Sequence, residues 1–412
     1  MSNEKYLVIN AGSSSLKFTL YEMPGYVQIV NGLVEKIGEG DSCCILKYGS
    51  KKSEKKCDVG NHSAAIKVMM DELLNNHFID DISEIKGVGH RILHGGEIYS
   101  ESVEIDDAVL NDIKALTKLG PLHHPGEIAG IVGMKTYLPG VPQVAVFDTA
   151  FHQTVPDYNY RYAVPKEWYT KYGVRKYGFH GTSHKYITQK MKEMLNKDDV
   201  NLIVCHIGSG ASISCVKNGI CYDTTMGLTP LDGLIMGTRS GSIDPSIIEY
   251  ICNETNMSVS EVTTILNKQS GLLGICGKND FRDLEKLVSH GSEDAKLAYK
   301  MLMSSIIKFV AQYYFELEGN VDAIVFTAGM GENGINMRKE VVNGISKVAG
   351  VSLDSDSNNN ISKRGTQQEG IISMPGSRFP ILVIPTDEEL MILEDTIRLS
   401  NKKEKTKVKE KV

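Results

Sequence analysis

The sequence lacks the features that mark zinc sites, redox centres and membrane spans. Its eight cysteines are scattered and no two are spaced as C-x-x-C, which removes the ligand pattern of zinc sites and of thioredoxin-like chemistry. No run of about 18 uncharged apolar residues occurs, and Met1–Asn10 hold no basic region followed by an apolar run. We therefore expect a reduced, cytoplasmic protein that does not bind a membrane.

The chain also lacks a basic excess. It has 45 Lys and Arg against 51 Asp and Glu, which gives a net charge of −6, opposite in sign to the usual footprint of a nucleic-acid-binding protein. Basic residues are concentrated only at the end, so we predict that residues 401–412 form a disordered basic tail. We expect no nucleic-acid partner, and any anionic ligand must be held by local groups.

The length and composition are those of a globular chain of two domains. It has 412 residues, of which 41% are hydrophobic and 23% charged, and domains average about 150 residues. A strand, a Gly/Ser turn and a second strand are predicted over 6–21, and the same pattern returns over 202–216, about 196 residues later. This repeat indicates duplicated domains.

The remaining elements alternate between strands and helices. Further strands are predicted over 86–93, 144–147, 323–326 and 381–384, and helices over 63–78, 108–118, 185–195, 294–318, 338–348 and 388–399. This alternation favours α/β layers, with a domain boundary near residue 150, where an apolar strand gives way to a polar segment.

Three glycine-rich turns are candidate phosphate sites. Gly12-Ser13-Ser14-Ser15, with Lys17 nearby, and Gly208-Ser209-Gly210 both follow apolar strands. Each alone is typical of an ordinary hairpin, but two such turns favour a nucleoside triphosphate. The third, Gly329–Gly334, fits G-x-G-x-x-G and leaves a Rossmann site as an alternative, although Asp354, the acidic residue at the required spacing, lies in a polar run.

Other catalytic motifs are excluded, whereas histidines and arginines recur beside glycines. No Walker A loop or G-x-S-x-G elbow is present. The i, i+4 pairs His90/His94 and His180/His184 have no third metal ligand, which favours structural or catalytic roles. Arg91 and Arg239 are flanked by small residues, which favours carboxylate or phosphate binding over surface ion pairs.

Five motifs in order make the chain resemble the acetate and propionate kinase family. They are Asn10–Lys17, Phe147–His152, Phe179–His184, Gly237–Gly241 and Thr327–Asn333, and the resemblance extends from residue 6 to about residue 398. It implies an α/β, duplicated actin-like (ribonuclease H-like) two-domain kinase fold with its active site in the interdomain cleft. Residues 1–150 and helix 388–400 would form the acid-binding domain, and 151–387 the nucleotide-binding domain.

The resemblance also implies an activity. It is reversible in-line phosphoryl transfer between ATP and acetate, giving acetyl phosphate and ADP, with Mg²⁺ (or Mn²⁺) as cofactor, in a homodimer. A propionate or other short-chain acid kinase is one alternative, and GTP or pyrophosphate as donor is another. An ATP-switched binding protein without catalysis is disfavoured, because such a switch needs no acetate site.

The family pattern assigns roles to residues of this chain. Arg91 and Arg239 would hold acetate and the transferring phosphoryl group, His180 would donate a hydrogen bond to that group, and Asp148 would orient them. Asn10 and Glu388 would hold the metal ion. Acetate would contact Arg91, Leu93, Leu122, His123, Phe179 and Pro230; the nucleotide would contact Ser13, Ser15, Lys17, His206, Gly208, Ser209, Gly210, Asp280, Phe281, Arg282, Gly329, Met330, Gly331, Glu332 and Asn333.

Several positions depart from the family pattern. Leu93 stands where valine is common, which predicts a narrower pocket and a preference for acetate over propionate. His124 and Ser209 replace asparagines, and Ser242 replaces an aspartate. Met330 replaces isoleucine, and the loop Gly277–Asp280 is one residue shorter. These changes leave the acid-binding residues intact. They lie mainly on the phosphate and nucleoside side, so the identity of the phosphoryl donor is left open.

Overall fold

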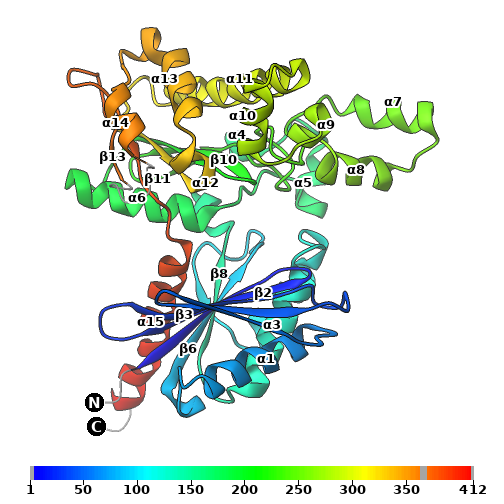
Figure 1. Ribbon diagram of the computed structural model, residues 1–412, viewed down its shortest axis with the longest axis vertical. Helices are drawn as coiled ribbons and strands as arrows, with labels where there is room; N and C mark the ends of the chain where they lie inside the picture. The colour runs from blue at the N-terminus through cyan, green and yellow to red at the C-terminus, as the bar shows by residue number, and fades with distance from the viewer. Residues whose placement is uncertain (1–3, 362–368, 410–412) are drawn as a thin grey trace. The chain divides into compact units, whose positions relative to one another are not determined.

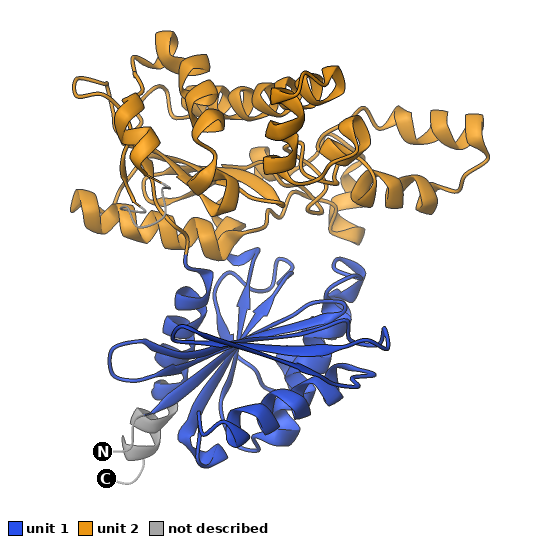
Figure 2. Cartoon of the chain, in the orientation of Figure 1, with its two compact units in different colours: residues 1–150, 387–412 blue, residues 151–386 orange. Residues whose placement is uncertain are grey.

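The chain divides into two compact units. The computed structural model describes residues 4–361 and 369–409. Unit 1 comprises Met1–Ala150 and Asp387–Val412, and unit 2 comprises Phe151–Thr386 (Figure 2). The first division follows directly after an apolar strand and a short polar turn, at the place where the sequence changes character.

Unit 1 is built on a mixed eight-stranded sheet of order β5-β4-β3-β2-β1-β6-β8-β7. Strands β1 to β5 form an antiparallel meander, β6 pairs parallel with β1, β8 pairs parallel with β6, and β7 closes the edge antiparallel to β8. The strands are β1 (Lys5–Ala11), β2 (Ser15–Glu22), β3 (Val27–Glu35), β4 (Cys43–Tyr48), β5 (Lys51–Lys56), β6 (Ile85–Ile92), β7 (Val103–Glu104) and β8 (Gln143–Phe147).

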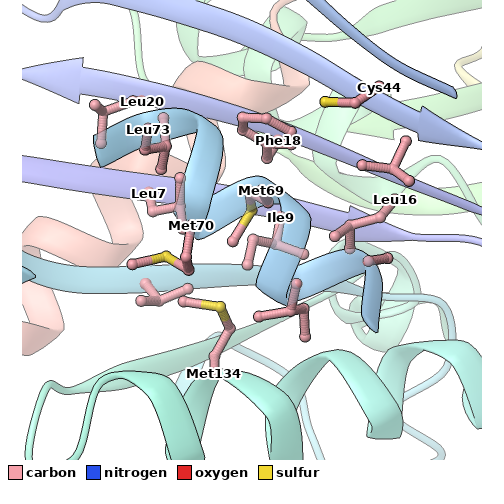
Figure 3. Close-up of a cluster of buried hydrophobic side chains, with 14 of the residues drawn as sticks. Leu7, Ile9, Leu16, Phe18, Leu20, Cys44, Met69, Met70, Leu73 and Met134 are labelled. Atoms are coloured by element: carbon pink, nitrogen blue, oxygen red, sulfur yellow. The ribbon is translucent and has the colours of Figure 1, made fainter. Parts of the chain in front are cut away.

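Alternate residues of β1 pack on opposite faces of this sheet. Leu7 and Ile9 join a core with Met69 of α1 and Met134 of α3 (Figure 3). Tyr6 and Val8 instead pack with residues of α15, at the far end of the chain. The helices of unit 1 are α1 (His62–Asn75), α2 (Asp107–Ala115), α3 (His124–Tyr137) and α15 (Glu388–Lys409), with short 3₁₀ turns at Ile82–Glu84 and Leu116–Lys118.

Helix α15 is longer than the helix predicted over 388–400. It runs from Glu388 to Lys409, and 410–412 lie outside the described residues. The last part is rich in lysine and glutamate, which favour helix, and positive charge is favourable near a helix C-terminus.

Unit 2 repeats the sheet of unit 1 with fewer strands. Its order is β11-β10-β9-β12-β14-β13, with β9 to β11 antiparallel, β12 and β14 parallel to β9, and β13 antiparallel at the edge. This is the arrangement of β3-β2-β1-β6-β8-β7 in unit 1. The strands are β9 (Leu202–Ile207), β10 (Ala211–Lys217), β11 (Ile220–Thr224), β12 (Ala323–Thr327), β13 (Gly370–Ile371) and β14 (Ile381–Val383).

Helices complete unit 2 (Figure 1). They are α4 (Asp157–Tyr160), α5 (Lys166–Tyr172), α6 (Gly181–Leu195), α7 (Ser246–Thr255), α8 (Val259–Lys268), α9 (Gly271–Cys276), α10 (Phe281–Ser289), α11 (Glu293–Glu316), α12 (Ala328–Asn333), α13 (Ile335–Ala349) and α14 (Ser355–Asn360). A 3₁₀ turn, Ala150–Thr154, leads into them. Within the described ranges, no helix has both the length and the apolar character needed to span a membrane.

Candidate functional site

The turn between β1 and β2 in unit 1 is tight and supported from behind. The backbone N–H of Gly12 donates to the carbonyl of Ser15 at 2.8 Å, and Asn10 and Lys17 are direct cross-strand partners beside it. Gly126 of α3 approaches so closely that a Cβ there would lie 2.4 Å from the Gly12 carbonyl oxygen. The polar ends of this turn are thus carried on a rigid support, as a phosphate or metal site requires.

Arg91 and Asp148 form a two-point ion pair at the ends of neighbouring parallel strands. Arg91 Nε and Nη2 donate to the two carboxylate oxygens of Asp148 at 3.1 and 2.7 Å. Asp148 is 1% exposed, and its negative charge raises the pKa of Arg91 further above its ordinary value. Arg91 therefore stays cationic, and its planar fork is held in one orientation.

Glu388 begins α15 and faces the same guanidinium. Its Oε2 lies 3.9 Å from Arg91 Nη1. Burial raises the pKa of Glu388, while the positive charges of Arg91 and Lys17 oppose that rise. Lys17 is thus near enough to act on Glu388, and Asn10 is the cross-strand partner of Lys17. These three predicted residues belong to one polar region of unit 1.

This region offers oxygen ligands of the kind that Mg²⁺ prefers. Asn10 has an amide oxygen and Glu388 a carboxylate that a cation would stabilise in its charged form. Among the described residues, no group of three or more His, Cys, Asp or Glu side chains is arranged to hold a metal. The donor set therefore fits a Mg²⁺ that keeps several water or phosphate ligands, and does not fit a closed structural metal site.

The acceptor residues predicted in unit 1 differ in exposure. Leu93 is 9% exposed and its backbone N–H donates to Oε1 of buried Glu127 at 3.0 Å, whereas Leu122 is largely exposed. His123 precedes α3, and His124 begins that helix, fully buried. Leu93 is therefore the predicted apolar side chain that is fixed in place here.

Glu127 was not anticipated from the sequence. Its Oε2 has no hydrogen-bond partner in the described part of the chain and lies 3.8 Å from His124 Nε2. Burial raises the pKa of Glu127 to about 8, and burial also lowers the pKa of His124. Glutamates are mostly exposed, and the sequence did not predict α3, so only the packing of that helix identifies this acid as buried.

Two histidines in unit 2 stack beside the second glycine turn. His180 has a left-handed backbone (φ 57°) immediately before α6, and its ring lies 4.2 Å from that of His206, at an interplanar angle of 25°. His206 is near the end of β9, and its Nδ1 lies 2.8 Å from Ser183 Oγ. The helix start and the strand end thus hold the two rings together.

Arg239 and His180 converge on Gly210. A Cβ at Gly210 would lie 3.3 Å from His180 Nε2 and 3.6 Å from Arg239 Nη1. Among the residues that the structure describes, no carboxylate pairs with Arg239, whose Nη1 instead donates to the Pro230 carbonyl at 3.3 Å. Partial burial lowers the pKa of Arg239. A half-buried cation without a carboxylate, next to an open glycine turn, is suited to an anionic ligand.

A cavity of about 480 Å³ adjoins this turn in unit 2. It is large enough for a nucleoside. Asp280 caps α10 and pairs with Arg282, which lowers the pKa of Asp280 to about 2. The lining residues are Gly208, Ser209, Gly237, Asn279, Asp280, Phe281, Arg282, Glu285, Gly329, Met330, Asn333 and Gly334.

Some predicted residues lie away from these polar groups. Gly331 and Glu332 do not line the cavity, and the Glu332 carboxylate accepts from the backbone N–H of Thr386 at 3.3 Å. Phe179 is 1% exposed within unit 2. Four cavity residues were not assigned to the nucleotide from the sequence, although only Glu285 lies outside the motifs and loops discussed there. They are Gly237, Asn279, Glu285 and Gly334.

The third glycine cluster does not form a dinucleotide fingerprint. Residues Ala328–Asn333 form the short helix α12, and the sheet of unit 2 is mixed, with antiparallel β9 to β11. A Rossmann unit requires a parallel sheet with an open loop at this point. Ser242, another departure, donates from Oγ to Asp232 at 2.6 Å and so supports the loop that carries Arg239.

Comparisons with known proteins agree over nearly the whole chain. Residues 5–394 match the acetokinase family. The acetate kinase of Bacillus velezensis is 47% identical over 399 residues, covering 96% of this chain and 99% of that protein. The crystal structure of Porphyromonas gingivalis acetate kinase has a TM-score of 0.90 and 40% identity, covering 96% and 99% of the two chains. A propionate kinase structure from Francisella tularensis also has a TM-score of 0.90, at 43% identity, covering 96% and 100%.

Proposed function

Because this chain belongs to the acetokinase family, we propose how its own residues carry out the reaction of that family. The resemblance predicted from the sequence is confirmed, and so is the duplicated actin-like α/β fold. The chain is an enzyme that transfers a phosphoryl group between ATP and the carboxylate of acetate. The roles of individual residues, the metal ion and the assembly are our proposals.

Unit 1 binds the carboxylate acceptor and unit 2 binds the nucleotide. In unit 1, Arg91 lies two residues before the buried Leu93. Its two hydrogen bonds to Asp148 fix the orientation of the Arg91 guanidinium. In unit 2, the cavity lined by Gly208 and Ser209 provides room for the nucleoside, and His180 and Arg239 at Gly210 face the phosphates. Direct in-line transfer then requires both sets of groups to act on one phosphoryl group.

The chemistry calls for cations and does not need a general base. A carboxylic acid such as acetate has a pKa near 4–5, so the acceptor is already ionised at neutral pH. The barrier comes from bringing that anion to an anionic γ-phosphate. Arg91 and Arg239 neutralise the developing charge, and His180 donates a hydrogen bond from Nε2. The observation that carries this proposal is the convergence of His180 and Arg239 on Gly210, where Arg239 has no carboxylate partner among the described residues.

We assign the metal site to Asn10 and Glu388. These residues would hold Mg²⁺, or Mn²⁺ in its place, which would supply positive charge to offset that of the phosphates. Asn10 supplies an amide oxygen and Glu388 a carboxylate, directly or through water. Lys17 is the cross-strand partner of Asn10 and acts electrostatically on Glu388, and it would contribute positive charge toward the phosphates.

Propionate is the second candidate acceptor. The similar structure from Francisella tularensis is a propionate kinase, so this fold accepts the longer acid in at least one relative. The fixed position of Leu93 supports acetate for this chain, because a bulky side chain leaves less room for an added methylene. We further propose a cytoplasmic homodimer, which sedimentation of the purified chain would test.

The test is a direct assay of the purified chain. Acetyl phosphate formation is measured with Mg²⁺, comparing ATP, GTP and pyrophosphate as donors and acetate and propionate as acceptors. We expect the highest kcat/KM for ATP with acetate. Replacing His180 by Ala should lower kcat about 100-fold while ADP binding persists. Unchanged turnover in that variant would remove His180 from the mechanism, and higher kcat/KM for propionate would overturn the acceptor assignment.

A further inference from the structure

Behind His180, three buried side chains form a continuous line of hydrogen-bonding groups. His180 Nδ1 lies 2.9 Å from Ser212 Oγ, which lies 2.8 Å from His184 Nε2. His184 Nδ1 in turn lies 2.8 Å from Ser214 Oγ. Ser212, His184 and Ser214 are all completely buried. The two histidines lie at the start of α6 and the two serines alternate along β10, so both pairs present their side chains on one face.

The number of protons in this line is limited. Each serine hydroxyl has one proton to donate, and a neutral imidazole has one N–H. Burial, followed by the charges of His152 and His206, lowers the pKa of His184 well below its ordinary value, so His184 is neutral at pH 7. It therefore donates from one ring nitrogen and accepts at the other.

Three orders of protons satisfy every contact when His180 is also neutral, because a serine hydroxyl can accept two hydrogen bonds. In the first, Ser214 donates to His184 Nδ1, His184 Nε2 donates to Ser212, and Ser212 donates to His180 Nδ1. In the second, every donor is reversed; in the third, His180 Nδ1 and His184 Nε2 both donate to Ser212. The first order leaves the proton of His180 on Nε2, whereas the other two leave a lone pair there.

The direction of Nε2 decides between them. This nitrogen lies 3.3 Å from where a Gly210 Cβ would stand, in the space that Arg239 also faces. An anion in that space accepts hydrogen bonds, so a lone pair on Nε2 would repel it. We propose that Ser214, His184 and Ser212 act as a relay that holds neutral His180 with its proton on Nε2, ready to donate to the transferring phosphoryl group. This role rests on the proposed function, and it makes the three relay residues positioning residues.

Two further contacts hold the ring and the backbone of His180 in place without determining which ring nitrogen carries the proton. Its ring stacks on His206, and the preceding peptide is held because His152 Nε2 lies 2.9 Å from the Phe179 carbonyl oxygen. The ring plane and the left-handed backbone are thus fixed by groups outside the relay. The relay determines which ring nitrogen of His180 carries the proton.

The first experiment reads the tautomers directly. Protein labelled with ¹⁵N at histidine is examined at pH 7.5 without nucleotide, using long-range ¹H–¹⁵N correlations, with His180→Ala and His184→Gln to assign the signals. We expect the Nε2–H form for both His180 and His184. A proton on Nδ1 of His180, or a doubly protonated His180 ring, would overturn the proposal. This result does not depend on turnover, so it is separable from a failure of the proposed function in the acetate assay.

The second experiment separates positioning from general stability. Ser212→Ala breaks the relay and should lower kcat about tenfold, with KM for ATP little changed, a smaller loss than the 10²–10³ expected when a donor is removed outright. His184→Gln keeps an amide N–H toward Ser212 and should retain kcat within about threefold, whereas His184→Ala should not.

A matched control is available on the same helix. Thr188 is buried in α6 and its hydroxyl donates to the His184 carbonyl at 2.7 Å, outside the relay. Thr188→Val should change stability more than kcat. Equal losses of kcat in Ser212→Ala and Thr188→Val, or no rescue by His184→Gln in a folded protein, would contradict the relay.

Discussion

The two units share one sheet design but hold their cations in opposite ways. In unit 1, Arg91 is bound at two points by Asp148 and also faces Glu388. In unit 2, Arg239 contacts a carbonyl and a thioether, and His180 Nδ1 faces the hydroxyl of Ser212. The same strand order therefore supports an ion-paired site in one copy and an anion-accepting site in the other.

This difference gives the two arginines different effects on protein stability and on ligand binding. A cation that is paired within the fold is fixed in direction before substrate binds, and its removal costs stability because the partner charge is left uncompensated. A cation without a carboxylate partner costs stability and regains favourable interactions only when an anion arrives. We infer that unit 1 holds Arg91 in a fixed orientation, whereas unit 2 leaves Arg239 available to bind phosphate.

The largest expected effect compares the two arginines. Arg239→Ala should lower kcat about 10³-fold, as loss of a phosphoryl-stabilising arginine does, with little change in the free energy of unfolding. Arg91→Ala should lower activity and also destabilise unit 1 by about 2 kcal/mol, less than the 3–5 kcal/mol of a fully buried pair, because Arg91 is 25% exposed. Kinetics and urea unfolding of both variants provide the measurement. Equal stability losses in the two variants would remove the contrast.

The next effect concerns the corresponding turns of the two sheets. Gly210→Ala places a methyl between His180 and Arg239 and should raise KM for ATP about 30-fold, since it occupies the space assigned to phosphate. Gly12→Ala meets chiefly the movable hydroxyl of Ser15, at 3.0 Å, so its effect should be several-fold smaller. Steady-state kinetics at saturating acetate test this order. A larger effect at Gly12 would move the donor phosphates toward unit 1.

A smaller effect tests whether acceptor choice resides in unit 1. Leu93→Val should raise kcat/KM for propionate relative to acetate about tenfold, within the 1–3 kcal/mol that one methylene is worth, and leave KM for ATP unchanged. The measurement is a competition between the two acids at fixed ATP. An unchanged ratio would mean that Leu93 does not limit the acceptor pocket.

The smallest effect is a pH dependence in unit 1. The pKa of Glu127 is raised to about 8 in the fold, above its unfolded value near 4.5, so the native state holds an extra proton and stability falls as pH rises between these values. The slope is at most about 1.4 kcal/mol per pH unit. His124 has a lowered pKa and acts below pH 6.5, so pH 6.5–8 isolates Glu127. Glu127→Gln should gain about 1 kcal/mol relative to the native chain across that window, in parallel urea titrations. A constant difference would contradict the assignment.

The sequence predicted the central strands of the two sheets better than the edge strand β5 and the glycine-containing helix α3. The strong apolar runs at β1, β9 and β12 and the repeated turns were visible because buried parallel strands have a near-continuous hydrophobic pattern. Strand β5 (Lys51–Lys56) was not, because an edge strand of lysines and glutamate has no apolar alternation. Helix α3 was missed since Gly126, Gly130 and Gly133 weaken its helical pattern.

The candidate site divides in the same way. Asp148, His180 and Arg239 were proposed from short motifs whose order along the chain is specific, and Arg91 from its position beside glycines and from the family pattern. Glu127 and the buried serines behind His180 were not, because their roles depend on which helix packs over which strand. A serine in a strand has no pattern that distinguishes a solvated hydroxyl from a buried relay, and only tertiary contacts give it one.

The return of α15 to unit 1 has a consequence for how the protein is made. The helix covers the sheet face that contains Tyr6 and Val8, and it begins with Glu388. Residues 151–386, which form unit 2, are therefore translated before α15 can pack on the sheet of unit 1. Until α15 emerges, Tyr6 and Val8 lack the apolar side chains of that helix that pack on them. Glu388, the carboxylate assigned to the metal, is also made after residues 151–386, so the nascent chain cannot become active before those residues have been translated.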